Sequence, residues 1–487
     1  MSLTRSTRRH FLKKSGVAAS FALFSGPILD FLGVTEDAFA AYVRPNVKGL
    51  TAASPTIVSY KKGIAAMKAL PAGNPLNWNA WANIHGIGPI PPSGSNPLWN
   101  TCQHGHWWFL PWHRMYLWYF ELAIRKFSGD PNFALPFWDY SDPTQRALPS
   151  MFRTPTVGNA LYVSARNATL NAGGMLTPST VDYTTAFSFT NFTGPTGSAA
   201  SFGSQTLTAP NHGASPHGQL ESRPHDSVHV AIGGWMGSFG TAARDPIFWL
   251  HHANIDRLWD LWLTTGGGRA DPNVATWCNQ SFQFFDPSGA TVAKKVSGVI
   301  NALPQLGYSY QGVPAVPTQK CGPFITTFPF PVLNVAAVTL MRREQPLTLG
   351  EQPATVSVPI DATASGRMLQ VAKDPKRSLV LRLEGIEVTA PPGIIYEVYI
   401  GLPATAPPDP KSPHYVGNVA PFGAEMHQGE FVQAFPIDAA AERVLAASPK
   451  QVDIRFVPRA PLDANGREVP PKLEGRVTFK RMRVITE

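Results

Sequence analysis

The chain has 487 residues, of which 44% are hydrophobic and 15% charged, so it can bury a large core and form two or three domains. Its 47 prolines and 41 glycines disfavour a mostly helical protein and favour long loops and short strands. The net charge of +9 is spread thinly, without a Lys/Arg-rich tract, which favours a soluble basic enzyme over a partner of nucleic acid.

Residues 1–40 are predicted to be an export signal and not part of the fold. The run Ser6–Lys14 (STRRHFLKK) resembles a twin-arginine signal, and a mildly apolar segment follows it. Glycine, proline and aspartate interrupt that segment, so we expect no stable membrane insertion. Ala38–Ala40 offers a small-x-small cleavage site, and the mature protein is expected in the periplasm or secreted. An ordinary basic N-terminus would explain the paired arginines but not the whole ordered set.

Helical periodicity marks several segments of residues 41–312, the part that holds every strong motif. Ile57–Leu70 and Asn77–His85 are predicted helices, and a third begins near Pro111 and continues to about Phe127. Residues 148–216 are rich in Ser, Thr, Gly and Asn with weak periodicity, which predicts long surface loops. Asp245 and Pro246 then predict the start of a helix that ends before Gly266.

The character of the chain changes after residue 312. Residues 313–335 are Pro-rich and aperiodic, which is typical of a linker. Alternating or β-branched runs follow and predict an all-β sandwich over residues 336–487, with structural or shielding duty. The runs are Ser378–Thr389, Ile394–Leu402, Gln451–Val457 and Arg476–Ile485.

Only three cysteines occur, so the chain is not a disulfide scaffold. A bridge between Cys278 and Cys321 is possible in an oxidising compartment and would leave Cys102 unpaired.

Seven of the thirteen histidines fall in two short aromatic windows, Cys102–Glu121 and Pro224–Trp262. Neutral imidazole suits copper, zinc, iron and nickel. His225 and His229 are spaced i, i+4, so a third imidazole from the helix around His252 would complete a set of three. His85, His104 and His113 could form a second set. A single histidine is more often a hydrogen-bonded core residue than a ligand, but this clustering favours a shared metal site.

These residues carry a family resemblance. The pattern H-x8-H-R from His104 to Arg114, with FLPWHR, resembles the first copper motif of tyrosinases and catechol oxidases. PHDSVH followed by DPIFWLHHANIDRLW resembles the second, and NIHG at His85 fits the more distant upstream histidine. The resemblance implies a mainly α catalytic domain, a four-helix bundle with long loops, over residues 41–312. It also implies two copper ions with O2 as co-substrate. The implied metal ligands are His85, His104 and His113 for one copper and His225, His229 and His252 for the other.

Two further histidines compete for ligand roles. His106 also precedes His113, but the family interval of eight residues selects His104. Of the adjacent His251 and His252 the family uses the second, and His251 would pack nearby.

The resemblance also assigns positions around the metals. Cys102 stands where some members form a thioether with the histidine two residues later, here His104; a small buried hydrophobe is the alternative. Phe239 stands where plant-type enzymes place an aromatic gate, with core packing as the alternative. Tyr308 and Tyr310 in LGYSY resemble a structural tyrosine motif whose partner is Arg44.

The implied reaction is oxidation of o-diphenols to o-quinones, and hydroxylation of monophenols where the phenol can first be deprotonated. Glu221 lies where the family places a carboxylate that holds a water. The residue after His225, often Asn in strong monophenol hydroxylases, is Asp226, which could still orient or accept from that water. Both carboxylates could instead be solvated loop charges or partners of Arg223.

The C-terminal runs LEGIEV and YEVYIGLP resemble the β-domain of plant-type polyphenol oxidases, which covers the copper entrance. We therefore expect a latent enzyme, although no plug residue is identifiable. Three other functions are compatible with parts of the pattern: a catechol oxidase or o-aminophenol oxidase without monophenolase activity, a hemocyanin-like O2 carrier, and a zinc hydrolase. Six histidines without a ligating carboxylate are atypical of the last. The substrates implied are small phenols, and the oligomeric state is not predicted.

Overall fold

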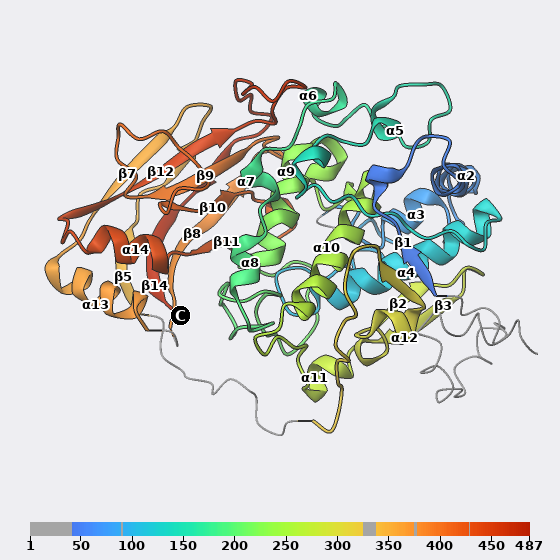
Figure 1. The fold of residues 1–487 in the computed structure, drawn as a ribbon, viewed down its shortest axis with the longest axis horizontal. Coiled ribbons are helices and arrows are strands. Elements are labelled where there is room, and N and C mark those ends of the chain that lie inside the picture. Colours follow the sequence, from blue (N-terminus) through green and yellow to red (C-terminus); the bar gives the residue numbers. More distant parts are fainter. Residues whose placement is uncertain (1–40, 89–90, 325–337, 375–376, 428) are drawn as a thin grey trace, which may run out of the picture. The chain divides into compact units, whose positions relative to one another are not determined.

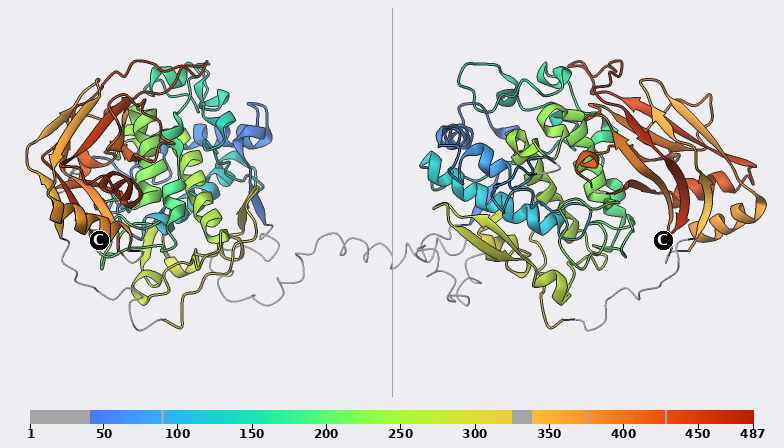
Figure 2. Two further views of the ribbon diagram at one scale, coloured as in Figure 1. Left: turned by 60° about the vertical axis from the view of Figure 1, so that its left-hand side comes forward. Right: turned by 180° about the vertical axis from the view of Figure 1, so that it is seen from behind.

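The computed structural model describes residues 41–88, 91–324, 338–374, 377–427 and 429–487. The predicted export signal at 1–40 and residues 325–335 of the predicted linker lie outside the described residues. The blue-to-yellow part of the chain is mainly helical and the orange-to-red part mainly strands (Figures 1 and 2). The helices nearest the histidine windows are α2 (Pro55–Ala69), α3 (Trp78–Ala82), α4 (Phe109–Ser128), α9 (Ser227–Ile232) and α10 (Ile247–Thr264).

The two long helices α4 and α10 pack against each other and are buried along most of their length. Helix α4 starts two residues before Pro111, and it ends where Gly129 adopts the left-handed conformation at φ 71°. At the start of α10, Oδ1 of Asp245 accepts the Ile247 N–H at 3.0 Å, as the predicted cap requires. The helix then stops before Gly266. Both predicted helices are therefore confirmed.

Other predictions for the helical part need adjustment. The helix expected over 77–85 is shorter than predicted: it is α3, which ends at Ala82, and His85 lies in the turn after it. The loop-rich stretch 148–216 contains four short helices. They are α5 (Ser150–Arg153), α6 (Ala168–Asn171), α7 (Pro178–Val181) and α8 (Thr184–Ser188), each too short to show helical periodicity. No helix of the described residues is long and apolar enough to cross a membrane.

The predicted tyrosine motif forms around Arg44 in β1 (Tyr42–Arg44). Its Nη1 donates to the Tyr310 hydroxyl at 2.8 Å, and its guanidinium lies 3.6 Å from the ring centre of Tyr308. Both tyrosines, in β4 (Tyr308–Tyr310), donate to Oδ2 of Asp256 on α10 at 2.6 and 2.7 Å. This buried network ties the two ends of the helical part to α10.

The possible disulfide is present between Cys278 and Cys321, whose Cα atoms are 5.8 Å apart. Cys278 ends the short helix α11 (Ala275–Cys278), and Cys102 is left free and buried. The hairpin of β2 (Ser281–Phe285) and β3 (Thr291–Lys295) and helix α12 (Ala302–Leu306) lie between the bridged cysteines.

The C-terminal part is built on two antiparallel sheets that share one hydrophobic core. One sheet has the order β10-β9-β12-β7, and the other has β5-β14-β8-β13-β6 with β11 also paired to β8. All four predicted runs contain strands, and the last one divides into two. The strands are β5 (Thr339–Arg343), β6 (Leu347–Leu349), β7 (Ala354–Pro359), β8 (Leu379–Val388), β9 (Ile395–Ile400), β10 (Tyr415–Val419), β11 (Phe431–Pro436), β12 (Gln451–Arg459), β13 (Val477–Phe479) and β14 (Arg481–Thr486).

The prediction of an all-β C-terminal part is wrong in one respect. Helices α13 (Ala362–Ala372) and α14 (Asp438–Leu445) pack on each other beside the strands (Figure 1). Asp361 caps α13 by accepting the Ala364 N–H, and α14 buries Ala440, Ala441 and Leu445 at helical spacing. These short amphipathic segments cover one edge of the core.

Candidate dinuclear metal centre

Seven buried histidines come together from separate segments of the helical part. They lie on the turn after α3, before and on α4, on the segment η5 (Glu221–Asp226) that leads into α9, and on α9 and α10. The two histidine windows, far apart in sequence, therefore form one cluster. Its members are His85, His104, His113, His225, His229, His251 and His252, each no more than 3% exposed.

The six histidines expected as ligands form two adjoining groups of three. In the first, the ring centres of His104 lie 5.1 Å from His85 and 4.9 Å from His113. In the second, the ring centres of His225 lie 4.6 Å from His229 and 4.9 Å from His252. The groups meet where His113 stacks on His252 at 4.4 Å. Two metal ions held by these groups would therefore be close neighbours.

Most of these imidazoles are anchored through Nδ1, which directs Nε2 into the cluster. Nδ1 of His85, His113 and His229 donates to the backbone carbonyls of Phe239, Phe109 and Met236, at 3.1, 2.8 and 2.7 Å. His225 donates to Oδ1 of Asp226 at 2.9 Å. A proton on Nδ1 leaves the lone pair on Nε2. Among the six expected ligands, the Nε2 atoms without a protein partner belong to His85, His104, His113 and His225.

The electrostatics of the cluster also suit a cation. Burial lowers the pKa of His113 to about 3, and it lowers the pKa of His104 well below the ordinary value, with neighbouring imidazoles adding to the effect. These rings are therefore neutral at physiological pH, as metal ligation requires. Nε2 of His229 faces Nε2 of His252 at 3.3 Å. Both nitrogens are close enough to each other to bind one metal ion, so the donor set fits metal ions.

The two competing histidines behave differently. His106 bonds at both ring nitrogens: Nε2 with the Asn211 carbonyl at 2.8 Å, and Nδ1 with the Trp108 N–H at 3.3 Å. His251 is fully buried with neither nitrogen bonded, and its ring centre lies 4.7 Å from His229. It can reach a metal together with His225, His229 and His252. The structure thus brings His251 closer to the second group than sequence spacing suggests.

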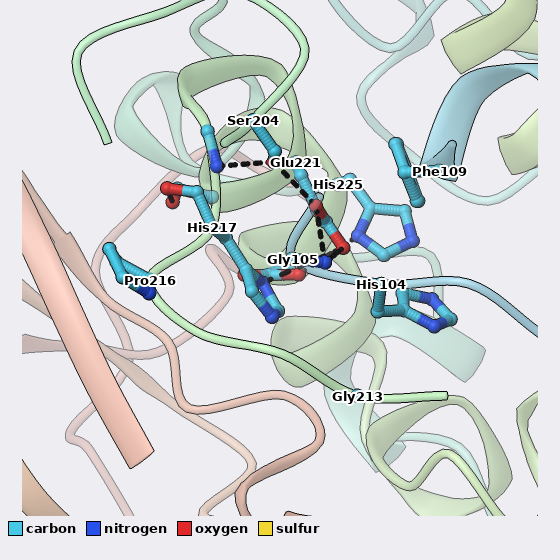
Figure 3. A network of polar contacts seen from close by, with 12 residues as sticks. His104, Gly105, Phe109, Ser204, Gly213, Pro216, His217, Glu221 and His225 are labelled. Atoms are coloured by element: carbon cyan, nitrogen blue, oxygen red, sulfur yellow. Dashed lines mark hydrogen bonds and ion pairs between the residues drawn. The ribbon is translucent and has the colours of Figure 1, made fainter. Parts of the chain in front are cut away.

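Glu221 is buried beside the loop that carries His104 and Gly105 (Figure 3). Its carboxylate accepts the Gly105 N–H, 2.9 Å from each oxygen, and the Ser204 hydroxyl at 2.9 Å. Burial raises its pKa to about 7, with the nearby Asp226 adding to the shift and His217 opposing it. A carboxyl with this pKa can exchange a proton near neutral pH.

Asp226 is also buried, and burial raises its pKa well above the ordinary value. The alternative of solvated charges or Arg223 partners is therefore wrong for both carboxylates. Arg223 instead donates to the Tyr415 hydroxyl at 2.5 Å. Asp226 lies between two imidazoles, 2.9 Å from Nδ1 of His225 and 2.7 Å from Nδ1 of His217. His217, which no sequence pattern singled out, is thus part of the site.

Cys102 lies between two imidazoles at the edge of the first group. Its Sγ is 3.2 Å from Nδ1 of His104 and 3.1 Å from Nδ1 of His212. Burial raises the pKa of the thiol well above its ordinary value. His212, in the loop that ends at the cis Ser215–Pro216 bond, is a second neighbour that sequence reasoning missed.

Two phenylalanines cover the histidines. The ring centre of Phe239 lies 4.2 Å from His104, and Phe422, from the loop between β10 and β11, stacks on His229 at 3.9 Å and 11°. The two phenylalanine rings are 4.4 Å apart. Glu425 fixes this arrangement, because its Oε1 accepts the Phe239 N–H at 3.1 Å. Phe422 is fully buried, so the C-terminal part closes over the second group.

Three family models match parts of the chain. Residues 75–209 and 179–265 match the common central domain of tyrosinase, and residues 271–321 match the polyphenol oxidase middle domain. Residues 339–430 match a domain of unknown function.

The chain is 35% identical to tyrosinase HcTyr1 of Hahella sp. over 375 residues, which cover 68% of this chain and 76% of that one. It is 31% identical to the latent form of the chloroplastic polyphenol oxidase of Prunus armeniaca, over 53% of this chain and 46% of that one. The structure of latent apple tyrosinase has a TM-score of 0.62 at 23% identity and covers 92% of this chain and 97% of that chain, a likeness of fold.

Proposed function

Because the chain belongs to the tyrosinase and polyphenol oxidase family of copper oxidoreductases, we propose that it uses O2 to hydroxylate monophenols and to oxidise o-diphenols to o-quinones. The observation that carries the proposal is the convergence of six buried, neutral imidazoles, four of which have an Nε2 atom without a protein partner. Oxygen uptake with tyrosine, 4-hydroxybenzoate and catechol tests it. Oxygen uptake with catechol alone would indicate a catechol oxidase. Reversible O2 binding without net uptake would indicate an O2 carrier.

We propose that one copper is held by His85, His104 and His113, and the other by His225, His229 and His252. The helices α3, α4, α9 and α10 that carry or flank these residues would form the predicted four-helix bundle. When bound, the copper pair supplies the two-electron redox chemistry with O2. Metal analysis tests the assignment: we expect two copper ions per chain, and one after either His113→Ala or His229→Ala. His251→Ala should keep both ions, whereas loss of one would make His251 a ligand.

For monophenols we propose that Glu221 and Asp226 act with a water between the protein and the phenol. The pKa of Glu221, raised by burial to about 7, suits a group that accepts a phenolic proton near neutral pH. Asp226 already bonds to His225 and His217, but each carboxyl oxygen has more than one lone pair and can also accept from a water.

We propose that the protein is latent and that Phe422 is the plug, with Phe239 as the gate beside it. A flat phenol approaching the second histidine group would need the face of His229, which the Phe422 ring covers at 3.9 Å. We also propose the domain division at 41–312, 313–335 and 336–487, in which one cut within the linker would separate Phe422 from the histidine cluster. Latency fails as a proposal if removal of the C-terminal part leaves catechol oxidation unchanged.

The remaining two proposals concern maturation. Cys102 forms a thioether with a ring carbon of His104, in which a C–S bond replaces the S–H and C–H bonds and O2 takes up the two electrons and two protons; the Sγ to Nδ1 distance of 3.2 Å supports it. Peptide mass spectrometry should find the two residues joined with the loss of two hydrogens, whereas a link to His212 would reassign the bond. Residues 1–40 direct twin-arginine export, and replacing Arg8 and Arg9 with Lys should keep the protein inside the cell.

A further inference from the structure

His217 is a buried imidazole with no part in the functions proposed so far. It is 3% exposed, its ring lies against Phe431 of β11 with ring centres 5.6 Å apart, and its Nδ1 is 3.8 Å from Oε1 of Glu221. Figure 3 shows it beside Glu221 and close to the loop of His104 and Gly105. Its shortest polar contact is to Asp226, where Nδ1 and Oδ2 are 2.7 Å apart.

Asp226 therefore bridges two histidines. Oδ2 bonds to His217, and Oδ1 accepts from Nδ1 of His225 at 2.9 Å. For His225 to present the Nε2 lone pair to a metal, its proton must be on Nδ1, so Oδ1 of Asp226 must stay in place as the acceptor. The orientation of the Asp226 carboxylate thus sets the tautomer and the direction of the His225 ring.

The anchoring of His225 differs from that of its neighbours. His85, His113 and His229 donate to backbone carbonyls, which the main chain holds in place. His225 donates to a side chain, and an aspartate can rotate about its own side-chain bonds. A carboxylate that serves as an anchor needs a second partner to stop this rotation, and among the described residues His217 bonds its other oxygen.

We infer that His217 is a positioning residue for the second copper: by bonding Oδ2 of Asp226 it fixes the carboxylate that aligns His225. The inference rests on the ligand set proposed above. Without His217, one buried carboxylate oxygen loses its partner and Asp226 turns to find another. His225 then loses its preferred tautomer, and copper binding by His225, His229 and His252 weakens, whereas the first copper keeps its three ligands.

The test compares three substitutions that share burial but differ in hydrogen bonding. His217→Asn places an amide N–H close to the position of Nδ1 and should preserve the bond to Asp226. His217→Leu removes the donor at similar volume, and His217→Gln moves it further along the side chain. The measurement is competition for Cu(I) between the purified chain and a chromogenic chelator, with copper per chain determined at each chelator concentration.

We expect the second copper to be lost at about 10-fold lower chelator concentration in His217→Leu and His217→Gln. This is the low end of the effect of removing the direct outer partner of a ligand, because His217 acts one step further out, through Asp226. His217→Asn should stay within a few-fold of the wild type. His106→Leu is the matched control, because it also removes a buried imidazole that is not a proposed ligand, and it should keep the second copper.

Three results decide the matter. Wild-type copper affinity in His217→Leu or His217→Gln would overturn the inference. If copper affinity falls equally in His217→Asn, the hydrogen bond is not the cause and His217 contributes only packing. If His217→Leu fails to fold, as shown by thermal unfolding of the metal-free chain, the Asn and Gln pair still decides. A wild-type chain that binds fewer than two copper ions, or a His225→Ala variant that binds two, would instead refute the proposed ligand set.

Discussion

Phe422→Ala should convert the latent protein into an active one without proteolysis. The Phe422 ring is fully buried and makes two close ring contacts, with His229 at 3.9 Å and with Phe239 at 4.4 Å. Truncating a buried phenylalanine removes about 3–5 kcal/mol of packing free energy. We take the lower figure as the contribution to closure, because an open loop exposes the ring to water.

A loss of 3 kcal/mol from closure raises the open population by about two orders of magnitude, since each 1.4 kcal/mol is a factor of ten. Truncation also clears the face of His229 directly. The assay is the initial rate of catechol oxidation by the copper-loaded, full-length chain, compared with wild type before and after removal of the C-terminal part. We expect the variant to reach the rate of the truncated wild type within a few-fold.

Phe479→Ala is the matched control. Phe479 is also fully buried in the C-terminal part, but it packs on Phe456 in the core between the sheets. This substitution should lower the unfolding temperature without raising the rate below that temperature. Equal activation by both substitutions would mean that general loosening opens the site, and an inactive Phe422→Ala would refute the plug.

Further predictions concern the carboxylates, the metals and the disulfide. Asp226→Leu should lower the ratio of monophenol hydroxylation to diphenol oxidation, and an unchanged ratio would remove Asp226 from the hydroxylation step. The rate of monophenol hydroxylation should rise with pH through about 7, because burial raises the pKa of Glu221 to about 7 and its ionised form accepts the proton. Glu221→Gln should abolish that rise. If the rise persists in this variant, another group is responsible for the pH dependence. Copper at about 1,000 times its dissociation constant should raise the unfolding free energy by about 4 kcal/mol per ion. The unfolding temperature should therefore fall when a chelator removes the copper. An unfolding temperature that does not change on chelation would contradict metal binding by the histidine cluster. The double substitution Cys278→Ser and Cys321→Ser should lower the free energy of unfolding by up to about 4 kcal/mol, the value for a disulfide with a sequence separation of 43. The folded variant should still oxidise catechol. Loss of copper in this variant would show that the disulfide also shapes the metal site.

The clustering of the six proposed ligands was predictable from sequence because copper ligation imposes local spacing. A short motif can carry two such constraints: His225 and His229 are one turn apart, and eight residues separate His104 from the pair His113-Arg114. The helices α4 and α10 were predictable for a similar reason, since each keeps its apolar period over several turns.

The closing elements of the site were not predictable in this way. Phe422 reaches His229 from a loop almost 200 residues further along the chain, and a single phenylalanine between β10 and β11 carries no local signal. His217 is a lone histidine whose partner, Asp226, becomes a neighbour only when η5 folds back. The spacing of four residues between His217 and Glu221 is a sequence cue that could have pointed to His217.

The burial of the two carboxylates also depended on tertiary structure. Glu221 and Asp226 stand in a charged, proline-containing segment that resembles a surface loop, yet the Gly105 N–H, Ser204 and two histidines receive them inside the protein. Hydrogen bonds from segments distant in sequence compensate for burying the charge, and local composition does not report such partners.

The central claim is that two copper ions in the histidine cluster oxidise phenols with O2. The most direct measurement is oxygen consumption with catechol by the chain freed of its C-terminal part, loaded in parallel with copper or with zinc. We predict continuous O2 consumption and quinone colour with copper and neither with zinc. Stoichiometric, reversible O2 binding without consumption, or equal behaviour of the two metal forms, would contradict the account.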